Sequence, residues 1–586
     1  MVATMGREDF YTTGTYFAPE LGVYAGWVAL ADSFAEHQVF LNENRDVALL
    51  FSGECFPGPE TKGRLRQNGH QFSENDGDWL VHFYEEQGDD FFAGLNGLFS
   101  GLLIDRRKNH LCLFNDRYGI QRIYYHETGG DFYFASEAKA LLRILPELRA
   151  FDDCGAAEFL AFGCTLEDRT LFHGVKRLPG AARWTFEHRH CRKESYFSPA
   201  SWEAQPLLGE EDYQAKFQAA FQRILPNYFG TAAKIGIALT GGLDTRMILA
   251  GHATGGGGQT SYTFTGPRGQ TLDDQVAARV AQAAGLEHRL LRLAPDFFND
   301  FAAHADKTVL VTDGEFGIAG AHEIYFNRRA RDLAPVRLTG NYGSEILRAI
   351  STFKPLPLAS GLLDPAWEKS FRTAGAGLAE HKKHPVTSAA FKEIPWNLHG
   401  SLMAGWSQVS FRSPYLDNEI VALAYQASDA TRRSSRSALR FIQACSPLMS
   451  EIPTDRGFIG ERRGMGILLR RIYAEVTFKL EYYQNEGLPR KVSPLNPLYR
   501  RVTSMMGLEG LHKFLRYASW YRGELSGYLT ERLASASARQ SRFWNPKFIE
   551  TMAADHISGR QNYGHEINKV LTLEAVERVL FRDLPR

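Results

Sequence analysis

The pattern of apolar residues changes near residue 205, and this change constrains the fold more than any other feature of the sequence. Between Val47 and Tyr196, short β-rich runs such as VALLFSGE and LFSGLLIDRR are separated by Gly, Asn and Asp, which predicts an antiparallel sheet with hairpins. Beyond Asp212, the segments KIGIALT, SYTFTG and VRLTGN alternate with amphipathic helical segments, a rhythm typical of a parallel α/β sheet. The last part of the chain looks helical. We therefore expect two domains, residues 1–204 and 205–586.

The composition is that of an ordinary globular protein without a charge bias. Lys and Arg number 67, as do Asp and Glu, so the sequence offers no basic surplus for a nucleic acid or a membrane surface. The six cysteines form no C-x-x-C pair, so neither a zinc site nor a disulfide framework is indicated. Apolar runs are shorter than the roughly 18 residues that span a bilayer, and the start lacks a signal-peptide pattern. We expect a cytoplasmic protein with no nucleic-acid and no membrane partner.

The segment Lys234–Gly251, KIGIALTGGLDTRMILAG, predicts a buried strand, a glycine turn and a helix that begins at about Thr245. Glycines after a strand let backbone N–H groups face an anion, and the helix N-terminus adds partial positive charge, which favours phosphate or pyrophosphate. Asp244 would repel a phosphate unless Mg²⁺ lay between them. The alternative is a glycine turn that only tightens a strand–helix connection and binds no ligand. The turn is not a Walker loop, because the G-x-x-x-x-G-K-S/T spacing is absent. The candidate nucleotide-binding residues of this turn are Leu239, Thr240, Gly241, Gly242, Asp244 and Thr245.

A second turn follows the predicted strand Val336–Gly340 and leads into another helical segment. Because the carboxyl ends of parallel strands converge on one crevice, we expect this turn to face the first one, with Gly340 beside the nucleotide. Glu345 would then supply a second carboxylate for Mg²⁺ or act in proton transfer. The alternative is a helix-capping Ser-Glu pair at the surface.

Five segments in order resemble the asparagine synthetase family. They are Leu95–Leu142, Thr170–Gly180, TGGLDT, LTGNYGSEIL and Phe411–Tyr425. The resemblance implies an α/β protein with an N-terminal α+β antiparallel β-sandwich of the class II glutamine amidotransferase type, which is Ntn-hydrolase-like. A parallel-sheet α/β ATP-pyrophosphatase domain with a helical C-terminal part would follow it.

The resemblance also implies a chemistry. A carboxylate attacks the α-phosphate of ATP, an acyl-adenylate forms with loss of Mg²⁺-bound pyrophosphate, and ammonia or an amine displaces AMP. The expected cofactors are ATP and Mg²⁺, with Asp244 and Glu345 as metal ligands. The expected substrates are a small-molecule or peptide carboxylate and ammonia or an amine as donor. We also consider a homodimer as one possible assembly of this chain.

The first departure from the family concerns glutamine hydrolysis. A working glutaminase of this class uses a cysteine directly after the initiator Met, whose α-amino group is the base, but this chain has Val2 there. The first cysteine, Cys55, is internal, and the family motif N-G-E is Ser52-Gly53-Glu54. Either glutaminase was lost, as in the β-lactam synthetases and lasso-peptide cyclases, or the start is truncated, since the family's opening strand looks missing before Phe10. We expect no glutamine hydrolysis.

Two further departures concern the synthetase site. In IPTDRGF, Ile452–Phe458, Asp455 takes the place of a family lysine, so we expect Arg456 beside it to supply the charge. In the second turn Ser344 takes the place of the family's metal-binding Asp, and a shift of one residue brings Glu345 there. The candidate catalytic residues are therefore Glu345, Arg456 and Tyr342. Asp273 and Asp274 read first as helix caps, with a role in ordering the nucleotide site as the alternative.

The sequence thus predicts an AMP-forming, ATP-dependent carbon–nitrogen ligase that joins a carboxylate to ammonia or an amine without its own glutaminase. One alternative is a catalytically inactive scaffold or regulatory homologue, which the altered lysine and second carboxylate motif favour. Another is a specialised cyclase of the β-lactam synthetase or lasso-cyclase type. The intact TGGLDT favours a working enzyme.

Overall fold

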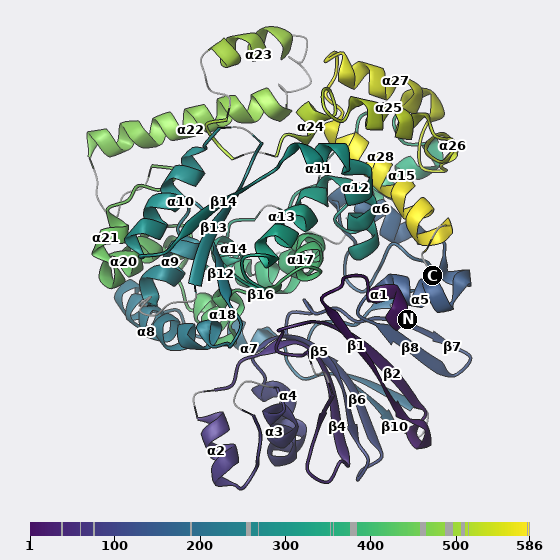
Figure 1. Cartoon of the computed structure of the whole chain (residues 1–586), viewed down its shortest axis with the longest axis vertical. Helices are drawn as coiled ribbons and strands as arrows, with labels where there is room; N and C mark the ends of the chain where they lie inside the picture. The colour runs from purple at the N-terminus through teal and green to yellow at the C-terminus, as the bar shows by residue number, and fades with distance from the viewer. Residues whose placement is uncertain are drawn as a thin grey trace.

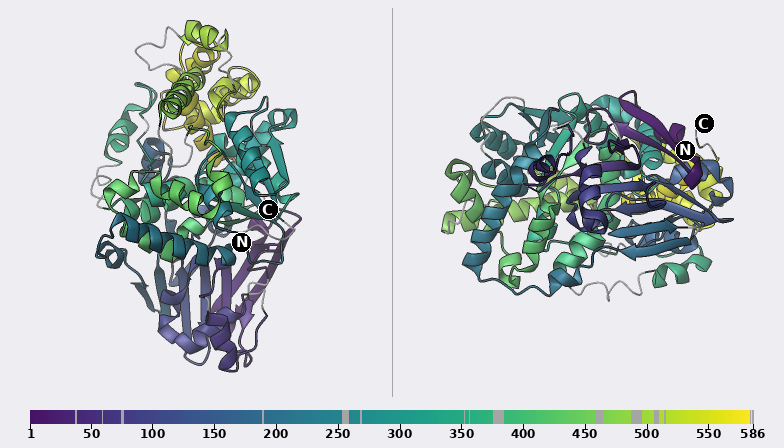
Figure 2. Two further views of the ribbon diagram at one scale, coloured as in Figure 1. Left: turned by 90° about the vertical axis from the view of Figure 1, so that its left-hand side faces the viewer. Right: turned by 90° about the horizontal axis from the view of Figure 1, so that it is seen from below.

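The computed structural model shows two halves in contact, with antiparallel sheets in the first half and a parallel sheet in the second (Figures 1 and 2). Further helices lie at the end of the molecule opposite the antiparallel sheets (Figure 1). The structure describes the whole chain except residues 37–38, 59, 74–76, 188–189, 253–258, 268, 352, 356, 375–383, 458–463, 487–495, 506–509, 514, 583 and 585–586.

The first half is built on a six-stranded antiparallel sheet with the order β11-β10-β6-β5-β4-β3. Every neighbouring pair runs antiparallel. The strands are β3 (Val39–Leu41), β4 (Val47–Cys55), β5 (Gly97–Asp105), β6 (His110–Asn115), β10 (Ala182–Glu187) and β11 (His190–Ser195).

Alternation along the strands gives this sheet two buried faces. Leu49 and Leu103 point into a core with helix α3 (Trp79–Gln87), whereas their neighbours Leu50 and Leu102 point into a core on the other face. That second core is completed by two smaller antiparallel groups of strands. They are β1 (Tyr11–Ala18) with β2 (Val23–Leu30), and β7 (Tyr124–Thr128) with β8 (Asp131–Ala135) and β9 (Lys176–Arg177).

The second half contains a five-stranded parallel sheet with the order β14-β13-β12-β15-β16. Its strands are β12 (Ile235–Ala238), β13 (Gln259–Thr265), β14 (His288–Arg292), β15 (Val336–Thr339) and β16 (Ser410–Arg412). Helices accompany the strands, among them α8 (Glu210–Phe229), α9 (Asp244–Gly251), α10 (Leu272–Ala283), α12 (Phe301–Val311), α13 (Ala321–Arg331), α14 (Gly343–Arg348), α17 (His399–Trp406), α18 (Asn418–Tyr425) and α20 (Arg436–Cys445).

The C-terminal part is helical and returns to the first half. Its helices include α22 (Met465–Glu486), α23 (Asn496–Met505), α24 (Tyr517–Trp520), α25 (Ser526–Ala534), α26 (Ala536–Gln540), α27 (Pro546–Ile557) and α28 (Gly564–Val576). Leu571 of α28 shares one hydrophobic core with Leu141 and Leu160 of the first half. A buried ion pair at 2.5 Å, Arg122 to Glu315, also joins the halves. The two halves therefore form one packed unit.

The predicted fold class is confirmed, because antiparallel sheets precede a parallel sheet and a helical end. The predicted helix at TGGLDT begins at Asp244, one residue earlier than expected. Helix α1 (Val2–Met5) precedes β1 in the chain. Among the described residues, no helix combines the length and the apolar character that crossing a membrane requires.

Candidate functional site

The two glycine turns lie side by side at the carboxyl ends of β12 and β15. Ala238 and Thr339 are paired in register, so the turns that follow them start at the same level of the sheet. The Thr245 hydroxyl donates to the carbonyl of Ala238 and accepts the Gly340 N–H, each at 3.1 Å. Thr245, which we expected to bind the nucleotide, therefore uses its hydroxyl to connect the two turns.

Glycines make this close approach possible. A Cβ on Gly340 would lie 2.4 Å from the Thr245 nitrogen, and one on Gly343 would lie 2.6 Å from Cγ of Asp244. Neither space accepts even a methyl group without movement. The second turn is thereby pressed against the start of helix α9.

A cavity of about 350 Å³ opens over the two turns. Among the sequence-predicted residues that line it are Leu239, Thr240, Gly242, Asp244, Thr245, Gly340, Tyr342 and Glu345. Two residues that were predicted for the site, Gly241 and Arg456, are not among the described residues that line the cavity. The structure thus brings together eight of the predicted residues from two distant segments.

Asp244 is only 18% exposed and is held by Arg348, whose Nη2 lies 2.9 Å from Oδ2. The carboxylate is shielded because the second turn packs against it, with Gly343 beside its side chain. Burial raises the pKa of Asp244, and the Arg348 guanidinium opposes this rise. Its other oxygen, Oδ1, is buried and has no hydrogen-bond partner among the described residues. An unsatisfied carboxylate oxygen at a polar cavity suits a cation ligand.

Glu345 carries the second carboxylate of this cavity. Burial raises its pKa, and the negative charge of Asp244 raises it further, so the two carboxylates repel each other across the cavity. The Ser344 hydroxyl donates to Oε2 of Glu345 at 3.0 Å. A divalent cation between the two carboxylates would remove this repulsion, so the donor set fits Mg²⁺.

Tyr342 lines the same cavity in a left-handed conformation, with φ at 74°. Its ring is buried and its hydroxyl has no hydrogen-bond partner in the part of the chain that the structure describes. Burial raises its pKa well above the usual value, and Glu345 adds to the rise. Tyr262, which the sequence analysis missed, also lines the cavity with a buried hydroxyl lacking a partner within the described ranges.

Gly241 faces away from the cavity, toward helix α10. Its N–H donates to Oδ1 of Asp273 at 2.6 Å, and its carbonyl accepts the N–H of Asp455 at 3.3 Å. Asp274 instead caps α10 through a reciprocal pair of hydrogen bonds with Thr271. Of the two acidic residues, Asp273 therefore hydrogen-bonds to the first glycine turn, whereas Asp274 caps helix α10.

Arg456 is turned away from the cavity. Its guanidinium lies 3.5 Å from the ring centroid of Phe478 in α22, and its ion pairs are to Asp455 and Glu475, at 3.7 and 3.9 Å. Phe458, the end of the segment IPTDRGF, lies outside the described residues. This geometry does not support the predicted catalytic role of Arg456.

A cation that the sequence analysis missed, Lys513, lines the cavity instead. Its Nζ lies 3.8 Å from Oδ2 of Asp273, which ties it to the first turn. Lys513 follows α23, far along the chain from either turn. No local motif marks it, so only the tertiary fold reveals its place.

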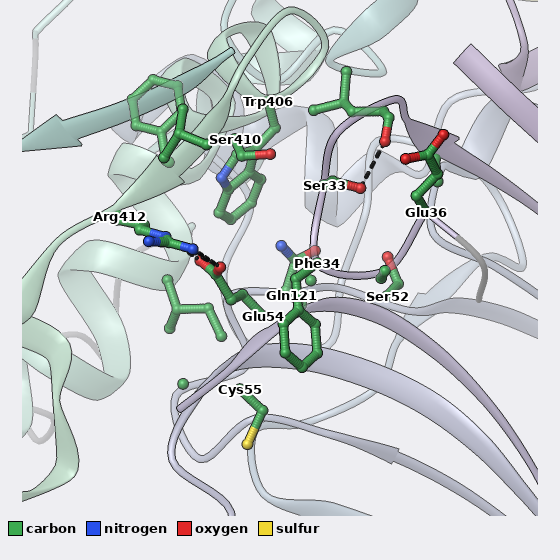
Figure 3. A pocket seen from close by; sticks show the side chains of 18 of the residues that line it. Ser33, Phe34, Glu36, Ser52, Glu54, Cys55, Gln121, Trp406, Ser410 and Arg412 are labelled. Carbon is green, nitrogen blue, oxygen red and sulfur yellow. Dashed lines mark hydrogen bonds and ion pairs between the residues drawn. The ribbon is translucent and has the colours of Figure 1, made fainter. Parts of the chain in front are cut away.

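A larger cavity of about 870 Å³ lies between the two halves (Figure 3). In it Glu54 of the SGE motif forms a bidentate ion pair with Arg412 of β16, with Nε 2.9 Å from Oε2 and Nη2 2.5 Å from Oε1. Cys55 follows Glu54, and burial raises the pKa of its thiol to about 12. Val2 lies against Gly26 of β2 and is not among the described lining residues. In this cavity, where the family resemblance implies a glutaminase site, Glu54 is therefore ion-paired with Arg412, and the raised pKa of Cys55 keeps its thiol protonated near neutral pH.

Comparisons with known proteins agree with the sequence motifs. Residues 12–197 match the family model of a glutamine amidotransferase domain. The chain is 26% identical over 353 residues to asparagine synthetase [glutamine-hydrolyzing] 3 of Bacillus subtilis strain 168, covering 55% of this chain and 56% of that relative. It is 27% identical over 227 residues to an asparagine synthetase [glutamine-hydrolyzing] of Triphysaria versicolor, covering 38% of this chain and 33% of the relative.

The matched region thus spans little more than half the length of the first relative and a third of the second. A solved structure of a glutamine phosphoribosylpyrophosphate amidotransferase from B. subtilis covers 45% of this chain and 50% of its own, with 13% identity and a TM-score of 0.21. That score is too low to inform the fold. The family model and the two synthetase relatives confirm the resemblance: this chain is similar to asparagine synthetases, and its residues 12–197 match a glutamine amidotransferase domain.

Proposed function

We propose that this chain is an ATP-dependent, AMP-forming amide-bond synthetase that adenylates a carboxylate and transfers the acyl group to ammonia or an amine. The observation that carries this proposal is the convergence of Asp244 and Glu345 on one cavity from two interlocked turns. The relatives support a ligase of the asparagine synthetase type.

Each part of the cavity has a task in this chemistry. Asp244 and Glu345 would hold Mg²⁺, which when bound would neutralise charge on the leaving pyrophosphate. Thr240 and Gly242 line the cavity just before α9 begins at Asp244, and the N-terminus of this helix favours an anion. Lys513 adds a positive charge on the cavity wall, and the buried Tyr342 hydroxyl is placed to donate a hydrogen bond. Together these groups bind and orient the nucleotide phosphates.

We propose further that the chain does not hydrolyse glutamine. The first cysteine, Cys55, is internal, and burial raises the pKa of its thiol to about 12, so the thiol stays protonated near neutral pH. Glu54, in the motif that would meet substrate glutamine, is engaged by Arg412. Ammonia or an amine would then reach the synthetase site from solution or from another protein.

One observation favours the alternative of an inactive scaffold. Three groups of the first turn that were expected to meet the nucleotide are engaged within the protein: Oδ2 of Asp244 by Arg348, the Gly241 N–H by Asp273, and the Thr245 hydroxyl by the carbonyl of Ala238. A turn of this kind is stable without ligand. The cyclase alternative differs only in its substrate, a carboxylate and an amine in one molecule.

Pyrophosphate release from ATP separates these functions. The purified chain is incubated with ATP, Mg²⁺ and a panel of carboxylates that includes aspartate, with ammonium present. We expect pyrophosphate and AMP in equal amounts with one class of carboxylate, and both products at a rate lower by roughly 10²-fold or more with Asp244→Asn. Turnover to ADP instead of AMP would contradict the proposed reaction. No turnover with any carboxylate, at intact ATP binding, would favour the scaffold.

The cellular location of the protein and its partners are also proposals. We place it in the cytoplasm, because all six cysteines are free and ATP is abundant there. We expect no nucleic-acid or membrane partner, since the net charge is zero. Light scattering of the purified chain measures whether it forms the homodimer that we considered as one assembly.

A further inference from the structure

Four metal-ligating side chains gather at one place in the first half. They are Glu43, His70, His82 and Glu85. Each offers one ligand atom, and these atoms all lie within 4.8 Å of one another. None of the four is a described lining residue of either cavity, so the cluster is separate from the sites above.

The cluster joins three segments that are distinct in the chain. Glu43 lies in the connection between β3 and β4, His70 follows helix α2 (Thr61–Gln67), and two members lie on α3. His82 and Glu85 are three residues apart on that helix and therefore share one face. Both are shielded from solvent, with side chains 3% and 16% exposed.

His82 is the centre of the cluster. Its Nδ1 lies 3.3 Å from Oε2 of Glu85 and 3.7 Å from Oε2 of Glu43. The ring of His70 lies against it, with the ring centroids 4.9 Å apart. A buried imidazole nitrogen therefore faces two carboxylates from different segments, with a second imidazole beside it.

The carboxylate of Glu85 is oriented by groups outside the cluster. Its Oε1 accepts the amide of Asn42 at 2.8 Å and Nη1 of Arg107 at 3.3 Å, while its Oε2 is the oxygen that faces His82. Hydrogen bonds of this kind fix the direction of a metal ligand before the metal arrives. The cluster thus offers four possible ligand atoms, and hydrogen bonds from Asn42 and Arg107 orient the carboxylate of Glu85.

We propose that Glu43, His70, His82 and Glu85 bind one Zn²⁺ ion. Two imidazoles and two carboxylates form a four-ligand set of the borderline kind that zinc accepts. Tetrahedral zinc with bonds of about 2.0–2.2 Å needs ligand atoms roughly 3.4 Å apart, which small rotations of these side chains supply. Because all four positions are filled by protein, the ion would be structural. It would fasten the segment after α2 to α3 and to the β3–β4 connection.

The experiment measures zinc binding by the full chain. The protein is purified without a polyhistidine tag, stripped with chelator and titrated with Zn²⁺ by calorimetry, with Co²⁺ absorption as a second readout of tetrahedral coordination. We expect one equivalent at this cluster and a rise in the unfolding temperature. Glu43→Gln and His70→Ala should each weaken affinity at least tenfold, the scale of losing one ligand or its support.

The variants are chosen so that a failure to fold does not obscure the result. Glu43 is exposed and His70 is half-buried, so both substitutions leave the core unchanged. His173→Ala, which removes an exposed histidine elsewhere in the first half, is the matched control and should bind zinc normally. Asp244→Asn should also bind normally, which separates this ion from the synthetase site. No stoichiometric binding, or binding unchanged by His70→Ala, would overturn the proposal.

Discussion

Arg348 holds Asp244 across the two turns, with Nη2 of the arginine 2.9 Å from Oδ2 of the aspartate. The pair joins the last residue of α14 to the first residue of α9. It leaves Oδ1 of Asp244 as the oxygen available to a metal ion. The carboxylate is thereby oriented by the protein before any ligand enters.

The first prediction concerns this carboxylate. Asp244→Asn keeps an oxygen that accepts from Arg348, so the fold should persist, but the negative charge that we propose binds Mg²⁺ is lost. We expect pyrophosphate release to fall by roughly 10²-fold or more, the scale of removing one preorganised charge stabiliser. Thermal unfolding and nucleotide binding provide the controls. Release at the wild-type rate would show that Asp244 is not a metal ligand.

The second prediction concerns Lys513. Its ammonium is a cation on the cavity wall, so Lys513→Ala should lower kcat/KM for ATP by about 10- to 100-fold, equal to about 1.4–2.7 kcal/mol of transition-state stabilisation. Lys513→Arg should recover part of the loss, because charge is kept with a different reach. The exposed Lys547 supplies the control, and Lys547→Ala should have normal kinetics. Equal kinetics for both alanine variants would exclude a role of Lys513 in phosphate binding.

The third prediction concerns the ammonia source. Because burial raises the pKa of the Cys55 thiol to about 12, this thiol is not a nucleophile near neutral pH. Glutamate release from glutamine should stay at background, and amide formation should depend on added ammonium or amine. Cys55→Ser should change neither measurement. Glutamate release that disappears in Cys55→Ser would contradict the proposal directly.

The sequence predicted those parts of the site that are local. A strand followed by a glycine turn and a helix is encoded within a few residues, and parallel pairing of β12 with β15 then brings Asp244 and Glu345 to one edge. Both were predicted from this logic. The burial of Asp244 was not, because it depends on the close fit of Gly343 from a segment far along the chain.

Contacts between distant segments account for the remaining differences. Arg456 was chosen by its position in a motif, but the ring of Phe478 in α22 draws its guanidinium away. Lys513 follows no motif and reaches the cavity only because the C-terminal helices return to the parallel sheet. The four residues of the proposed zinc site likewise show no recognisable spacing, since three segments supply them. Sequence patterns identify elements and turns, whereas such pairings depend on packing.

The fourth prediction uses two glycines that differ in their surroundings. A Cβ on Gly242 would meet only Oγ1 of Thr240, at 3.4 Å, so Gly242→Val should fold normally and yet lose nucleotide binding, because the side chain would fill the position that we propose for the phosphates. A Cβ on Gly343 would lie 2.6 Å from Cγ of Asp244, so Gly343→Ala should cost about 1–3 kcal/mol of stability. Denaturant unfolding and calorimetric ATP binding test both. Normal ATP binding by Gly242→Val would place the phosphates elsewhere.

The fifth prediction concerns Lys569, which α28 buries against the carbonyl of Leu160 in the first half. Burial lowers its pKa to about 7, so the folded state releases this proton at a lower pH than the unfolded chain, whose lysine titrates near 10.4. The cost of burying the charge is therefore complete at pH 7 and below, and it diminishes as pH rises from 7 toward 10. Lys569→Met should stabilise the protein most at pH 6 and progressively less at pH 8 and 9. Denaturant unfolding at these pH values measures the difference, with the exposed Lys547→Met as control. A stability difference that stays constant from pH 6 to pH 9 would show that the ammonium is not desolvated at this contact between the halves.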